Sequence, residues 1–149
     1  MDKEKQKIWE KHKEYIQLLS KVNNSYVFVA EYKLSYLFLS DNFENLGYNP
    51  KIIHSSNINP DYLETRIHLD DLVILKSTQS KLLKYIQTLP VDQRKDYKHI
   101  YECRVKNADG NYIRLIFQQQ ILELYEDGTP WLILGILDVS PDTSSLEQI

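Results

Sequence analysis

The chain has 149 residues, of which 42% are hydrophobic and 26% charged, and this composition excludes disorder throughout and suits one domain with its own core. The net charge of −3 disfavours direct binding to a nucleic-acid backbone, because domains that do this carry an excess of Lys and Arg. A single cysteine excludes an intrachain disulfide, and no apolar run approaches the roughly 20 residues that span a bilayer, so we expect a cytoplasmic protein with no membrane contact.

The first predicted element is an amphipathic helix from Lys3 to Val22. A seam of residues recurs there at alternating steps of four and three, as in coiled coils. The seam consists of Ile8, His12, Tyr15, Leu19 and Val22. Trp9 and Ile16 widen it. Two interpretations carry equal weight: the seam joins two copies of the chain, or the helix lies on its own domain, since two heptads are short for an independent coiled coil.

Two strands and a short helix are predicted next. The runs 26–32 and 36–40 are rich in β-branched and aromatic residues, and a short polar link joins them, which favours a hairpin. A brief helix over 43–46 then ends at Gly47, because a helix end needs a residue with positive φ. The polar stretch 51–60 is expected to be a loop.

The longest internal helix is predicted to begin after Asp70 or Asp71, either of which can cap its free N–H groups. Its leucines follow helical spacing as far as Pro90, which closes it. Three strands follow, separated by turns that contain Asp-Gly, and they cover 97–107, 112–125 and 131–139.

The order of these elements predicts an α+β fold, because two groups of antiparallel strands are separated by helices. We expect three segments along the chain: the N-terminal amphipathic helix over 1–22, the folded domain over 23–140, and a polar linker over 141–149 that leads to an output domain.

Four short stretches, in this order, resemble the sequence pattern of the PAS family. They are Ser-Asp-Asn-Phe-Glu-Asn-Leu-Gly-Tyr at 40–48, Ile-His-Leu-Asp-Asp-Leu at 67–72, the strand that enters Asp-Gly at 101–110, and Gly-Ile-Leu-Asp-Val-Ser at 135–140. Leu69 stands where the family usually has Pro. The resemblance covers most of 26–140 and implies a five-stranded antiparallel sheet, with short helices and one longer helix on one face.

The resemblance also implies a sensor or dimerisation module, which in many relatives holds a ligand between the hollow face of the sheet and the helices. Residues expected to line such a pocket here are Phe28, Phe38, Leu75, Ile100, Phe117 and Leu134. An error of one residue in a strand moves a side chain to the opposite face. The alternative, which we favour, is that these side chains simply fill the core.

Asp138 follows the last apolar run and precedes the expected linker. The resemblance suggests that it passes a signal from the sheet to the output domain. The alternative is an acidic residue at a strand end that makes a turn contact.

No cofactor, metal or catalytic group is predicted. The flavin-binding branch of the family uses a reactive cysteine on a helix after the second strand, whereas Cys103 lies on a predicted strand. Haem-binding relatives often use a histidine on the long helix, and 71–89 contains none. Metal-ligand spacings and nucleotide-binding motifs are also missing from the sequence.

We therefore expect a sensory PAS domain that is not an enzyme, that forms a homodimer and that has a small molecule as a possible ligand. DNA would be contacted only by a separate helix-turn-helix output domain of a transcriptional regulator. The alternatives are the PAS domain of a soluble histidine kinase, a small α+β enzyme with a conical cavity, and a dimerisation module with a filled core.

Overall fold

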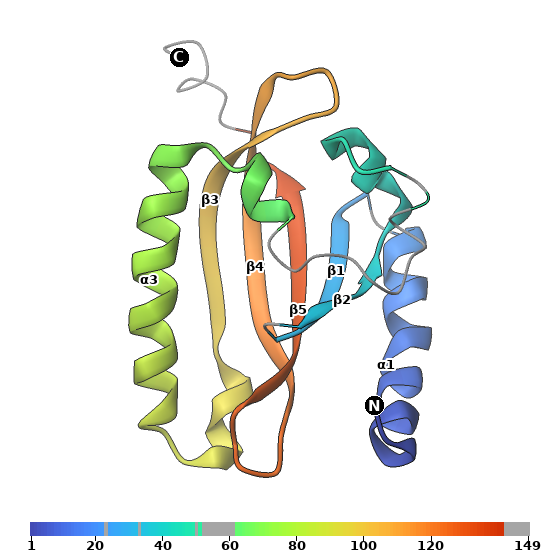
Figure 1. The fold of residues 1–149 in the computed structure, drawn as a ribbon, viewed down its shortest axis with the longest axis vertical. Coiled ribbons are helices and arrows are strands. Elements are labelled where there is room, and N and C mark those ends of the chain that lie inside the picture. The colour runs from blue at the N-terminus through green and yellow to red at the C-terminus, as the bar shows by residue number, and fades with distance from the viewer. Residues whose placement is uncertain (23, 33, 50, 52–61, 142–149) are drawn as a thin grey trace.

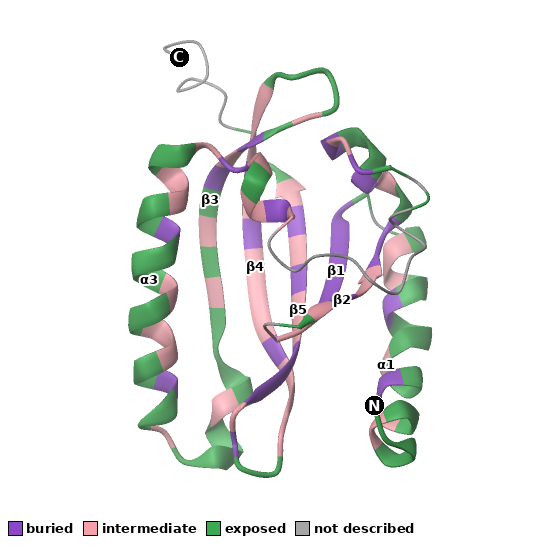
Figure 2. Ribbon diagram, in the orientation of Figure 1, coloured by how far each residue is buried: buried purple, intermediate pink, exposed green. Residues whose placement is uncertain are grey.

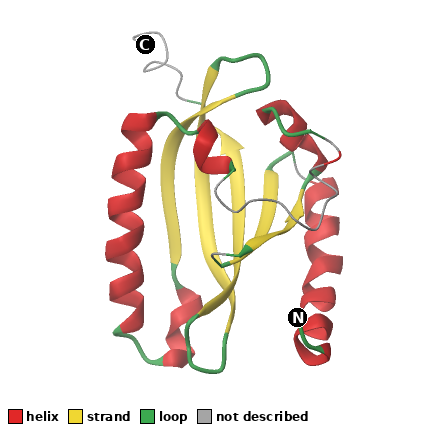
Figure 3. Ribbon diagram, viewed as in Figure 1, coloured by secondary structure: helices red, strands yellow, loops and turns green. Residues whose placement is uncertain are grey.

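The computed structural model describes residues 1–22, 24–32, 34–49, 51 and 62–141. It has an α+β fold built on one five-stranded antiparallel sheet with the strand order β2-β1-β5-β4-β3 (Figures 1 and 3). The strands are β1 (Tyr26–Glu31), β2 (Ser35–Leu39), β3 (Lys98–Lys106), β4 (Tyr112–Leu124) and β5 (Pro130–Val139). The helices are α1 (Lys3–Val22), α3 (Leu69–Gln87) and three short 3₁₀ helices, η1 (Asp41–Leu46), η2 (Leu63–Arg66) and η3 (Val91–Asp96).

Strand β1 is buried along most of its length (Figure 2). Strand β1 reads as a continuous apolar run because each of its faces meets a different layer. Tyr26 and Phe28 point into a cluster with residues of η1, η2 and α3, whereas Val27 and Val29 point into a second cluster with α1. The sheet therefore separates an inner core from an outer one.

Helix α1 packs on the outer face through Trp9 and Ile16, which are buried against Val27, Val29 and other apolar residues of the sheet. His12 adds a polar contact, with its Nε2 atom 2.8 Å from Oε1 of Glu123. Helix α1 therefore lies on its own domain, which is one of the two interpretations of its sequence.

The edge strand β3 is covered at one end by the start of α3. The His68 amide donates to the Arg104 carbonyl at 2.9 Å, and the Asp71 carboxylate accepts from the Arg104 backbone amide at 2.7 Å and from its guanidinium at 2.9 Å. These bonds occupy backbone groups that an edge strand would otherwise expose. The prediction that Asp70 or Asp71 caps α3 was wrong. The cap is His68, whose Nδ1 accepts from the Asp70 amide at 3.2 Å.

The sequence predicted the elements well but not all of their boundaries. Each strand lies within two residues of its expected ends, and Gly47 ends η1 with a φ of 87°. Between α3 and β3, the residues Val91–Asp96 form the 3₁₀ helix η3, for which no prediction was made. The loop predicted over 51–60, apart from Lys51, and residues 142–149 of the predicted linker lie outside the described residues. Within the described ranges, no helix is long and apolar enough to cross a membrane.

Candidate functional site

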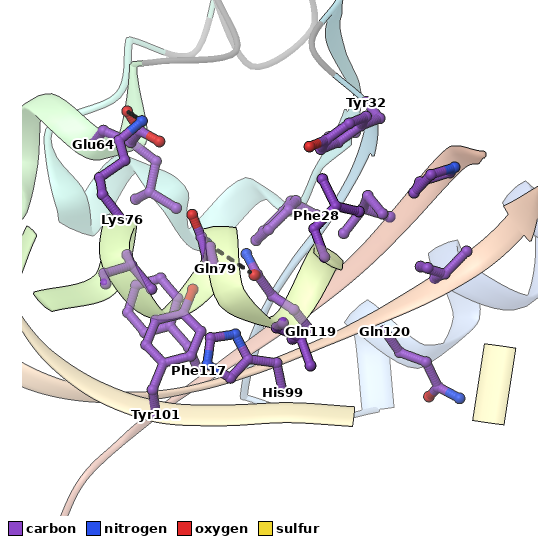
Figure 4. Close-up of a pocket in the computed structure, with 18 of the residues that line it drawn as sticks. Phe28, Tyr32, Glu64, Lys76, Gln79, His99, Tyr101, Phe117, Gln119 and Gln120 are labelled. Carbon is purple, nitrogen blue, oxygen red and sulfur yellow. Dashed lines mark hydrogen bonds and ion pairs between the residues drawn. The ribbon is translucent and has the colours of Figure 1, made fainter. Parts of the chain in front are cut away.

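A cavity of about 400 Å³ lies between α3 and the inner face of the sheet (Figure 4). Each of the five strands contributes at least one residue to the lining of the cavity. Helix α3 forms the opposite wall with Leu75, Gln79, Leu82, Leu83 and Ile86. Its size falls in the range of small-molecule sites, and its lining is largely apolar, as in such sites.

One wall of the cavity is a row of aromatic rings from β3 and β4. The His99 and Tyr101 rings lie 4.5 Å apart, and the Tyr101 and Phe117 rings stack at 4.9 Å with an angle of 23° between their planes. Phe28 of β1 and Tyr36 of β2 form an edge-to-face pair at 5.4 Å on the other side. The site thus offers flat aromatic surface to a planar molecule.

Two glutamines face each other across the cavity. Gln79 extends from α3 and Gln119 from β4, and Nε2 of Gln79 lies 3.4 Å from Oε1 of Gln119 (Figure 4). This is a long and therefore weak hydrogen bond. Burial lowers the pKa of the His99 imidazole, so its ring is neutral at pH 7, and burial raises the pKa of the Tyr101 hydroxyl above its usual value. All four polar groups are uncharged near neutral pH.

The charged residues that line the cavity have partners. Lys76 pairs with Glu64 at 2.8 Å, and both side chains are partly exposed, so this ion pair lies at the rim. The Glu31 carboxylate accepts a hydrogen bond of 3.1 Å from the indole N–H of Trp131. Trp131 itself belongs to the outer cluster with α1, so this bond connects the cavity to the layer on the other side of the sheet.

Three of the six predicted pocket residues line this cavity, namely Phe28, Leu75 and Phe117. For the other three, the predicted sheet face was wrong. Phe38 and Leu134 pack in the outer cluster. Ile100 precedes Tyr101 on β3, and its side chain is 60% exposed. Side chains alternate along a strand, so each of them points away from the cavity.

The polar residues His99, Tyr101 and Gln119 were missed as site residues. A usable signal existed for Tyr101, because its alternation with Cys103 and Val105 predicts one common inner face, and the latter two are buried there. The same alternation places Ile100 on the opposite face. Gln119 shares the inner face of β4 with Phe117, two residues before it.

The seam predicted on α1 is divided by the fold. Ile8, His12 and Leu19 are half-buried on the side that meets the domain, whereas Tyr15 and Val22 are 70% and 74% exposed. The division arises because Trp9 and Ile16, the largest apolar side chains facing the sheet, set the rotation of the helix. The five residues therefore do not form one free surface.

Asp138 lies where the start of β1 meets the end of β5. Ser25 is buried and precedes β1, and its hydroxyl donates a hydrogen bond to the Asp138 carboxylate. Asn42 continues this polar chain by donating to the Ser25 carbonyl at 3.1 Å. Asp138 thus joins the end of the last strand to the segment that leads to α1.

Comparisons with known proteins place this geometry in a structural class. No protein-family model matches the sequence, and no curated protein sequence matches it. A domain of a protein named as a light and redox sensing histidine kinase from Haloarcula marismortui matches with a TM-score of 0.58 and 18% identity, covering 85% of this chain and 97% of that one.

Two further solved structures agree with this match. The N-terminal domain of a diguanylate cyclase with PAS/PAC sensor from Marinobacter aquaeolei has a TM-score of 0.55 and 16% identity, and the match covers 84% of this chain and 99% of that one. A light-oxygen-voltage domain has a TM-score of 0.58 and 11% identity, with 91% of each chain covered. The chain has the fold of PAS and light-oxygen-voltage domains.

Proposed function

We propose that this chain is a sensory domain in which a small molecule occupies the cavity under α3 and thereby changes how α1 is held on the opposite face of the sheet. The observation that carries the proposal is that strand β1 contributes to both places. Phe28 lines the cavity, and the adjacent residues Val27 and Val29 hold α1. The proteins of similar fold that are named as sensors support this use of the fold.

Two contacts offer a physical route for the signal. The first runs from Glu31 at the cavity to the Trp131 indole and on to α1, because Trp131 and Trp9 belong to the same packed cluster. The second joins Ser25 to Asp138, so that a shift of β1 would also reach the end of β5. Packed layers transmit small displacements because they have little free volume.

We also propose that the cavity binds its ligand without converting it. The two acidic residues at its lining, Glu31 and Glu64, already have partners for their carboxylates. Cys103 lies close by, but burial raises the pKa of its thiol to about 12, which leaves no thiolate to act as a nucleophile near neutral pH. Among the described residues, no group of three His, Cys, Asp or Glu side chains is placed to hold a metal ion.

The coupling can be tested by filling the cavity with a side chain. Leu83→Trp adds bulk to a cavity-lining position of α3, and Lys84→Trp adds the same side chain at the exposed neighbouring position. We expect the first variant to change hydrogen exchange of the α1 amides and the second to leave it unchanged. If Leu83→Trp folds and its α1 amides exchange as in the wild type, the cavity and α1 are not coupled.

We further propose a homodimer formed through the exposed side of α1. Tyr15, Leu18 and Val22 recur there at steps of three and four residues and are 60% exposed or more. Sedimentation of the wild type and of Val22→Glu tests this, and a wild type that stays monomeric at high concentration rejects it. The output would be a helix-turn-helix domain or, as the second candidate favoured by the histidine kinase of similar fold, a kinase. The complete coding sequence of the gene would decide between them.

A further inference from the structure

We propose that the cavity recognises an uncharged, planar aromatic molecule with a hydrogen-bond donor next to an acceptor, such as an aromatic amide, through Gln79 and Gln119. This inference rests on the proposed function, because it names the ligand class of the same cavity.

The two glutamines are poorly satisfied by the protein. Among the described residues, their mutual contact of 3.4 Å is the one hydrogen bond that either side chain makes. Each amide can donate twice and accept twice. A carboxamide placed between them would accept from one glutamine and donate to the other, replacing one long bond by two of normal length.

Tyr101 and His99 add two more uncharged groups to the same wall. Within the described ranges, no hydrogen bond to the Tyr101 hydroxyl or the His99 imidazole is formed, and both rings line the cavity. The stacked rings of Tyr101 and Phe117 provide the flat surface on which a planar ligand would rest.

A charged ligand fits the cavity less well. Glu64 and Lys76 neutralise each other at the rim, and Glu31 accepts a hydrogen bond from Trp131, so the charged residues described at the cavity offer no unpaired counter-ion beside the glutamines. A charge buried without a partner costs several times more free energy than an amide that finds its hydrogen bonds. The cavity therefore selects against both anions and cations of the same shape.

The test uses four probes of one shape, added to the full chain and followed by NMR. 2-Naphthamide carries the donor and the acceptor, 2-acetylnaphthalene lacks the donor, 2-naphthoate is an anion and 2-naphthamidine is a cation. We expect 2-naphthamide to shift the side-chain NH₂ resonances of Gln79 and Gln119 and to bind about tenfold more tightly than the other three, because each of them leaves a buried group unpaired.

Variants tie the preference to these residues. Gln79→Leu and Gln119→Leu should each reduce the preference for 2-naphthamide to about threefold or less, since one partner is lost. Gln118→Leu is the matched control, because Gln118 is the neighbouring residue of β4 that does not line the cavity, and it should retain the preference.

Three results would overturn the inference: a competitor that binds as tightly as the amide, a preference that survives both glutamine substitutions, or no shift with any probe. The experiment distinguishes a failure of the ligand class from a failure of the coupling to α1. If 2-naphthamide binds with the expected preference but α1 exchange is unchanged, the ligand class stands and the coupling does not. If 2-acetylnaphthalene binds equally well and α1 responds, the coupling stands and the ligand class does not.

Discussion

Gly135 supports the cavity wall by lacking a side chain. It is the cross-strand partner of Phe28, and a Cβ atom built on it would lie 2.0 Å from Cε2 and 2.2 Å from Cζ of the Phe28 ring. These separations are far below contact distance, so in Gly135→Ala the ring must leave its position over β5. Because Phe28 also lines the cavity, the displaced ring would reduce the cavity volume.

The expected loss of stability follows from two opposing effects. Overpacking a filled site costs about 1–3 kcal/mol, and replacing Gly by Ala returns about 0.4–1 kcal/mol by restricting the unfolded chain. The midpoints give a net loss of about 1.3 kcal/mol in the free energy of unfolding. Urea unfolding followed by circular dichroism measures this quantity as a shift of the midpoint at constant slope.

A double-mutant cycle with Phe28→Ala identifies the cause. The Ala side chain at 135 can occupy space left by the ring, so the double variant should lose at least about 1 kcal/mol less than the sum of the single losses. Equal stability of Gly135→Ala and the wild type, or additive losses in the cycle, would refute the steric account of this contact.

Three further predictions concern contacts between layers. Trp9→Ala should lower the free energy of unfolding by about 3–5 kcal/mol, whereas Gln17→Ala, at an exposed position of the same helix, should stay within about 0.5 kcal/mol of the wild type in chemical denaturation. Burial raises the pKa of Asp71, but the hydrogen bonds and charge of Arg104 outweigh it and hold the pKa below its usual value. Asp71→Asn should therefore lower the free energy of unfolding by about 1.5–3 kcal/mol at pH 7. This difference in stability should vanish as the pH falls below about 3.9 and through the lowered pKa, because the wild-type carboxyl then becomes protonated. A difference in stability that does not change with pH would contradict this account. Asp138→Ala should cost about 1–2 kcal/mol by leaving the buried Ser25 hydroxyl unpaired, and additivity with Ser25→Ala in urea unfolding would show that the bond contributes nothing.

The sequence predicted the order of elements because periodicity and turn residues are local signals. Gly47 and the Asp109-Gly110 turn mark element ends through backbone conformations that few other residues adopt. The capping of α3 could not be predicted in the same way. Asp71 was a suitable cap by type, but the distant Arg104 on β3 binds its carboxylate, and a contact between residues 33 positions apart leaves no local trace.

The sequence holds information on which face a side chain takes only where polar residues alternate with apolar ones. Strand β5 is apolar at nearly every position because both of its faces are covered, so nothing in its pattern shows that Leu134 faces α1 and not the cavity. Phe38 on β2 has apolar neighbours on both sides for the same reason. Ile100 differs, since the pattern of Tyr101, Cys103 and Val105 already excludes it from the inner face.

The absence of alternation in β1 and β5 is also what makes coupling between the cavity and α1 physically feasible. A strand that is buried on both faces has tight packing on each side, so a ligand that displaces Phe28 works against the same backbone that holds Val27 and Val29 under Trp9. The energies are comparable: burial of Trp9 contributes about 3–5 kcal/mol, and shifting a two-state equilibrium from 1:99 to 99:1 takes about 5.5 kcal/mol. A ligand with micromolar affinity has about 8 kcal/mol of binding free energy available, so part of it suffices to release or tighten α1. A sheet with one solvated face would leave that displacement without a packed layer to act on.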